Sequence, residues 1–223
     1  MSTVVVVRKG RRAAIAADTL TSLGDQGLAA SYKVVPEKVF RLGDSFVAMT
    51  GNPVNRLVLE SIVARDGTVP ALSGRREIFE WLRGMHSSLK EDYFVNTKEG
   101  EKDTYESMQM NFLLANSHGI FGVHSDRDVY EYSRFWATGS GGEYALGAMA
   151  AVYEREQDAG RIAEIGVVCA TEFDRSSAEP ITVFTLDLAN ERQKGTQQRQ
   201  GSLVTARASK TGRGRATRSR RRA

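Results

Sequence analysis

The chain contains 223 residues, 41% of them hydrophobic, which is enough for one domain with a sizeable core. Its formal net charge is +4, but eight of the 31 basic residues lie in the acid-free stretch 207–223, so residues 1–206 carry 23 basic and 27 acidic side chains. The single cysteine, Cys169, excludes an intrachain disulfide. Because no signal-peptide pattern appears and no apolar run approaches the roughly 20 residues of a membrane span, we expect a cytoplasmic protein.

The first part of the chain has the pattern of short β-strands. Two runs of small and β-branched residues, 3–7 and 13–17, flank the polar sequence RKGRR and predict a hairpin of largely buried strands. A looser stretch follows, with Gly24, Gly27 and Pro36 as breakers. The sequence KVFRLGDSFVAMTG then predicts two further strands joined by a tight turn.

Helices and strands then alternate in blocks. Apolar residues recur at helical spacing in 52–65 and again in 75–89, which predicts two consecutive helices. Residues 110–132 return to strands, GSGGEYALGAMAAVYE and 161–171 predict two more helices, and PITVFTLD predicts a last strand. This order indicates an α+β domain of mostly antiparallel strands, with helix pairs available for opposite faces. The polar and then Arg-rich sequence after residue 190 is predicted to be disordered.

Four short segments carry a family resemblance by their order and separation: IAADT, EKVFRL, AMTGN and TGSGG. With them, the chain resembles the HslV peptidase and proteasome β subunits, which are N-terminal nucleophile hydrolases of the threonine-protease type, and especially their bacterial proteasome homologues. The resemblance extends from Ser2 to about Asp187. It implies a four-layer αββα sandwich in a domain formed by residues 1–190, followed by a C-terminal tail, 191–223.

The resemblance places the nucleophile at the residue that follows Met1. Because the Ser2 side chain is small, methionine aminopeptidase should remove Met1 and free the Ser2 amine. That residue would then supply both the attacking Oγ and, through its α-amine, the general base. Family members usually have threonine there, whose methyl group restricts χ1, and Thr3 is the other candidate for the mature terminus.

Four further residues match catalytic positions of the family. Lys38 would supply a cation that lowers the pKa of the Ser2 amine, and Asp18 would hold Lys38 in a buried ion pair. Gly51 would donate its backbone N–H to the developing oxyanion. Ser140 would join the proton-transfer network near the amine.

The resemblance also concerns the substrate pocket and one missing group. The alignment places Val167 at the family's second aspartate, with Glu172 and Asp174 a turn or two away, so we expect this carboxylate to be absent. Met49 falls where the family lines its first specificity pocket, which suggests an apolar preference. The residues expected to bind substrate are Thr21, Met49, Asn52 and Pro53.

Simpler interpretations remain open for the same residues. Asp18 and Lys38 could be ordinary solvated charges, and TGSGG could be a helix N-cap or a phosphate cradle, although it lacks the rest of a Walker motif. Cys169 lies on an apolar helix face and is expected to be a core residue. The three histidines share no ligand spacing with it, so we expect no metal site and no cofactor.

As to function, the resemblance implies a self-compartmentalising peptidase, a homo-oligomer of stacked rings that hydrolyses protein or peptide substrates and has an ATP-dependent unfoldase as a possible partner. The Arg-rich tail could bind an anionic partner nonspecifically or remain solvated, and no membrane partner is expected. The alternative is a catalytically weak or inactive ring-forming relative that acts as a binding or scaffold protein. An amidase acting on a small molecule without a chamber is a third possibility.

Overall fold

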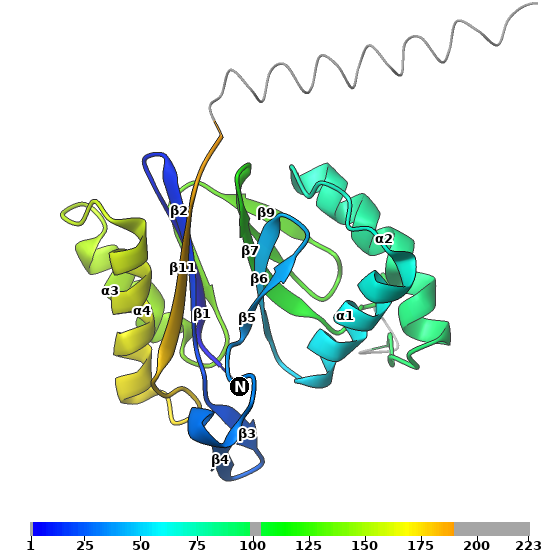
Figure 1. Ribbon diagram of the computed structural model, residues 1–223, viewed down its shortest axis with the longest axis horizontal. Coiled ribbons are helices and arrows are strands. Elements are labelled where there is room, and N and C mark those ends of the chain that lie inside the picture. The colour runs from blue at the N-terminus through cyan, green and yellow to red at the C-terminus, as the bar shows by residue number, and fades with distance from the viewer. Residues whose placement is uncertain (1, 99–103, 190–223) are drawn as a thin grey trace, which may run out of the picture. The chain divides into compact units, whose positions relative to one another are not determined.

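The computed structural model describes residues 2–98 and 104–189, and its compact unit ends at Leu188 (Figure 1). Two antiparallel sheets form the centre of this unit. In the four-stranded sheet the order is β10-β1-β2-β11, from Phe135–Thr138, Val4–Lys9, Arg12–Asp18 and Ile181–Asp187. In the five-stranded sheet the order is β5-β6-β7-β8-β9, from Val39–Leu42, Ser45–Thr50, Asn111–Asn116, Gly119–Val123 and Val129–Tyr132. The predicted tail, 191–223, lies outside the described residues.

A pair of helices covers the outer face of each sheet. Helices α1 (Val54–Asp66) and α2 (Arg75–Glu91) lie beside the five-stranded sheet, and α3 (Gly142–Val152) and α4 (Ala159–Phe173) lie beside the four-stranded sheet (Figure 1). The expected α+β sandwich with the layer order αββα is therefore confirmed. Within the described ranges, no helix is both long and apolar enough to cross a bilayer.

The first strand, β1, lies between two hydrophobic cores, and its sequence suits this position. Successive side chains of a strand point to opposite faces, so Val4 and Val6 pack between the sheets, whereas Val5 and Val7 pack against α3 and α4. Both faces of β1 are buried from Val4 to Val7, which explains why these four residues are all apolar instead of alternating, whereas Arg8 and Lys9 at the strand end are half-buried. The first strand thus lies inside the sandwich, between β10 and β2.

The stretch after β2 differs from the expectation of a loose segment. It contains a hairpin, β3 (Thr21–Leu23) and β4 (Gln26–Leu28), and then a short 3-10 helix, Ala30–Tyr32. Most of these residues are exposed or half-buried, so no hydrophobic pattern indicated strands there. The hairpin and the 3-10 helix precede Lys33 and Lys38, two residues of the candidate site described below.

Candidate active site

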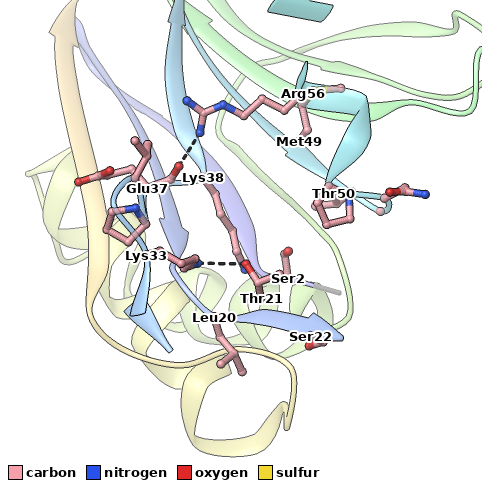
Figure 2. A pocket seen from close by; sticks show the side chains of 15 residues that line it. Ser2, Leu20, Thr21, Ser22, Lys33, Glu37, Lys38, Met49, Thr50 and Arg56 are labelled. Atoms are coloured by element: carbon pink, nitrogen blue, oxygen red, sulfur yellow. Dashed lines mark hydrogen bonds between the residues drawn. The ribbon is translucent and has the colours of Figure 1, made fainter. Parts of the chain in front are cut away.

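Ser2 lies two residues before the first residue of β1 and forms part of a pocket wall (Figure 2). The residue is only 6% exposed. Gly139, which follows β10, has φ +95°, and a Cβ at this position would lie 1.9 Å from the Ser2 carbonyl oxygen. Only glycine tolerates both this left-handed backbone and this close approach, so Gly139 allows the turn after β10 to lie against Ser2.

The pocket beside Ser2 has a volume of about 210 Å³. This is smaller than the roughly 300 Å³ at which drug-sized ligand sites begin, and it suits a single side chain of a larger substrate. All four residues expected to bind substrate line it, and Gly51, with φ +97°, does so too. The residues brought together there from separate segments are Ser2, Thr21, Lys38, Met49, Gly51, Asn52 and Pro53.

Asp18 and Lys38 form a buried ion pair at this site. Asp18 is the last residue of β2 and is 0% exposed, and Lys38 Nζ lies 2.6 Å from its Oδ1. The carboxylate also accepts hydrogen bonds from the backbone N–H groups of Thr3 at 2.9 Å, Leu20 at 3.0 Å and Ala178 at 3.3 Å. These donors compensate for burial of the charge, so Asp18 joins the start of the chain to Lys38 and to the segment before β11.

Lys38 reaches the pocket from the residue before β5. Burial lowers the pKa of this lysine, and the contact with Asp18 opposes the shift without cancelling it. Its ammonium is held at a fixed distance from one carboxylate oxygen, beside Ser2 (Figure 2). The arrangement places a positive charge where it can lower the proton affinity of a neighbouring amine.

A second hydrogen-bond network lies on the other side of Thr3. Asp174 Oδ2 accepts hydrogen bonds from Ser140 Oγ and Ser177 Oγ, both at 2.7 Å. The Ser177 hydroxyl is in turn 2.7 Å from Thr3 Oγ1. Burial raises the pKa of Asp174, but the hydrogen bonds from Ser177, Ser140 and the Ser176 amide outweigh it and hold this pKa below its ordinary value. Asp174 is therefore an ionised acceptor beside Ser140.

The structure places a carboxylate, Asp174, in the hydrogen-bond network of Ser140 and Ser177, although Val167 was expected to leave none there. Val167 is 0% exposed and packs in the core between α4 and the four-stranded sheet, whereas Asp174 lies one residue beyond the end of α4. The carboxylate comes from the turn after the helix and not from the helix itself, so an alignment that searched within the helix missed it. The polar sequence DRSS directly after the helix was the available signal, because it contains both Asp174 and Ser177.

Both networks include Thr3, the residue that follows Ser2. Thr3 donates its N–H to Asp18 and shares a hydrogen bond with Ser177, so both its backbone and its side chain are held. The Thr3 hydroxyl therefore belongs to the Asp174 network, while Ser2 lines the pocket. Within the described part of the chain, no three His, Cys, Asp or Glu side chains are grouped to hold a metal ion.

Solved structures provide the comparison with known proteins, because no family model and no curated protein matches the chain. BPH from Thiobacillus denitrificans is 41% identical over 85% of this chain and 100% of its own, with a TM-score of 0.78. The same protein in complex with epoxomicin matches with 41% identity over 84% of this chain and 100% of its own, and a TM-score of 0.77.

A more distant structure extends the likeness of fold. HslV from Trypanosoma brucei is 21% identical over 83% of this chain and 99% of its own, with a TM-score of 0.61. The identity with BPH, over most of both chains, confirms the family expected from the four sequence segments. The chain belongs to the HslV and proteasome β-subunit family of N-terminal nucleophile hydrolases.

Proposed function

We propose that this protein is a proteasome-type peptidase that hydrolyses peptide bonds through Ser2 after removal of Met1. The observation that carries the proposal is the position of Ser2 on the wall of a pocket that it shares with Lys38, whose ammonium is paired with the fully buried Asp18. A buried ion pair contributes little net stability, so its position beside a hydroxyl and a pocket favours a functional role. Epoxomicin bound to BPH supports the same assignment by similarity.

The proposed reaction uses one residue as nucleophile and base. Ser2 Oγ attacks the substrate carbonyl, and its proton passes to the Ser2 α-amine, whose ordinary pKa of about 7.7–8.0 is lowered by the Lys38 charge. The Gly51 N–H stabilises the oxyanion. When the C–N bond breaks, the leaving amine takes the proton back from the α-ammonium. Water then attacks the resulting ester with the same amine as base, which releases the acid and restores Ser2.

Asp174 takes the role that the sequence seemed to lack. Its charge and its bonds to Ser140 and Ser177 order the hydroxyls beside the amine, so that protons move along a fixed path. The expected absence of this carboxylate and the serine in place of threonine both favoured an inactive scaffold, and the hydrogen bonds of Asp174 support the active peptidase instead.

Replacing Asp174 by asparagine is expected to lower kcat by about 100-fold, because the neutral amide keeps the shape but not the acceptor strength of the carboxylate. Steady-state hydrolysis of a fluorogenic peptide measures the change. The matched control is Glu172→Gln, which neutralises an exposed carboxylate two residues away and is expected to leave kcat unchanged. Wild-type kcat in the Asp174→Asn variant would remove Asp174 from the mechanism.

We further propose that the active protein is a homo-oligomer of stacked rings that encloses its sites and accepts protein or peptide substrates. Exposed Tyr144 on α3 and Phe173 on α4 pack against each other, with ring centroids 5.5 Å apart. This pair of apolar side chains, together with the family resemblance, supports a subunit contact on the helix face. An ATP-dependent unfoldase is the partner that such a chamber would need for folded substrates.

A peptidyl epoxyketone tests the proposed nucleophile directly, because the reagent forms its ring adduct only with a residue that supplies both a terminal amine and a hydroxyl. We expect intact and peptide mass spectrometry to show protein without Met1 and one adduct on Ser2. The Ser2→Ala variant keeps the amine, lacks the hydroxyl and should stay unmodified. A free Ser2 that remains unmodified at saturating reagent would overturn the assignment.

A further inference from the structure

Lys33 is a second lysine in the pocket, and the reaction proposed above does not use it. It follows the 3-10 helix Ala30–Tyr32, and its N–H donates to the Ala30 carbonyl, after which the backbone is extended, with φ −117° and ψ 138°. Its Nζ donates to the Thr19 carbonyl and, at 3.0 Å, to Thr21 Oγ1 (Figure 2). The 3-10 helix thus sets the direction of the Lys33 side chain toward the pocket wall.

The acceptors of Lys33 differ in charge from those of the other two cations that line the pocket. Lys38 is paired with Asp18 at 2.6 Å, and Arg56 is paired with Glu60 at 2.8 Å. Lys33 takes part in no ion pair among the described residues, and both oxygens that it contacts are uncharged. An ammonium has three N–H donors, so one donor of Lys33 is left for a ligand.

Glu37 is the one acidic residue that lines the pocket, and it does not neutralise Lys33 by contact. Its side chain is exposed, and Figure 2 shows the carboxylate directed away from Ser2. The Glu37 backbone carbonyl accepts a hydrogen bond from Arg56 instead. Partial burial lowers the pKa of Lys33, while the charges of Asp18 and Glu37 act in the opposite direction from a distance. Among the described residues, Lys33 is therefore a pocket cation whose ammonium no carboxylate contacts.

We propose that Lys33 selects substrates with an acidic side chain at the residue whose carbonyl is attacked. This inference rests on the proposed function, because Ser2 must be the nucleophile for that side chain to enter this pocket. The methylenes of a glutamate would pack against Met49 and Leu20, and its carboxylate would accept a charge-assisted hydrogen bond from Lys33 Nζ.

The sequence instead suggested an apolar substrate residue for this pocket, and that prediction rested on Met49 alone. An apolar side chain in the pocket would remove water from the Lys33 ammonium without giving it a partner, which is unfavourable. A basic side chain would meet the Lys33 ammonium, which no carboxylate contacts, and would be disfavoured. The charges of the pocket thus favour an anion and act against both other classes of side chain.

The test compares peptidyl epoxyketones that are identical except for glutamate, glutamine, leucine or lysine at the residue nearest the epoxyketone. Intact mass spectrometry gives the rate of Ser2 modification for each reagent, and matched fluorogenic peptides give kcat/KM. We expect glutamate to be preferred over the isosteric glutamine by about tenfold, and this ratio to fall as salt is added, because part of the attraction is screened.

The Lys33→Gln variant is expected to bring the glutamate-to-glutamine ratio close to one. Lys98→Gln, an exposed lysine remote in sequence from the pocket-lining residues, should keep the wild-type ratio. The Lys33→Arg variant restores the cation. Recovery of the glutamate-to-glutamine ratio in this variant would show that the charge at position 33, and not the packing of the lysine, determines the preference.

The outcomes distinguish this inference from the function on which it rests. Rapid modification of Ser2 without preference for glutamate, or a preference that survives in Lys33→Gln, would overturn the role of Lys33 and leave the nucleophile in place. Failure of all four reagents to modify Ser2 would overturn the proposed function and the inference with it.

Discussion

Replacing Ser2 by alanine is expected to abolish peptide hydrolysis, with kcat/KM reduced by about 10³-fold or more, because the variant has no hydroxyl to form the ester intermediate. The fold should be unaffected, since Ser2 precedes β1 and contributes no side chain to the three apolar core clusters. Hydrolysis of a fluorogenic peptide measures the loss, and circular dichroism verifies the fold.

Ser2→Thr is the matched control for this experiment. It keeps the amine and the hydroxyl and adds a methyl group that restricts χ1, so we expect activity within about tenfold of wild type, in either direction. Activity retained in Ser2→Ala would assign hydrolysis to another residue. Equal loss in both variants would show that the position tolerates no change, and would leave the hydroxyl without a demonstrated role.

Replacing Lys38 by methionine is expected to affect both activity and stability. The substitution removes the cation beside the Ser2 amine and leaves the Asp18 charge buried, with only backbone N–H donors around it. Loss of one partner of a buried pair costs about 3–5 kcal/mol of unfolding free energy. Urea denaturation measures this change, and peptide hydrolysis should fall by at least about 10²-fold.

The double variant Asp18→Asn/Lys38→Met separates the two effects. Removing the stranded charge is expected to recover part of the lost stability, although the amide cannot accept all the hydrogen bonds that the carboxylate accepts. Activity should stay as low as in the single variant, because the cation is still missing. Recovery of hydrolysis together with stability would mean that the ion pair supports the fold and has no part in the reaction.

The layers of the fold could be predicted because they are encoded in local periodicity. Strand β1 begins with four consecutive buried valines, Val4 to Val7, and α2 repeats its apolar residues every three or four positions, so each sequence predicts its own element. The β3–β4 hairpin escaped prediction because its exposed residues form no apolar pattern. Its position depends on contacts with the rest of the fold, which local sequence does not record.

The candidate site was predictable only in part, and its two missed residues, Asp174 and Lys33, escaped prediction for different reasons. Ser2, Asp18 and Lys38 lie at strand termini, where a motif and an element boundary coincide. The sequence predicts that the last helix ends at residue 171, but α4 continues to Phe173, so Asp174 is the residue directly after the helix and its contacts could not be read from helical spacing. Lys33 lies in a segment without a motif, and its position became evident only from its contacts with Thr19 and Thr21.

The hydrogen bonds of the Asp18 carboxylate also indicate at which stage of folding the candidate site becomes complete. Its four hydrogen-bond donors come from residues 3, 20, 38 and 178, so the segment before the last strand must dock before the carboxylate is fully surrounded. A contact across 160 residues forms late, because ordering so long a stretch of chain is entropically costly. Until residue 178 has docked, a folding chain would therefore present Ser2 without the complete hydrogen-bond shell of Asp18, so the proposed hydrolysis would begin only after this distant segment has joined the sheet.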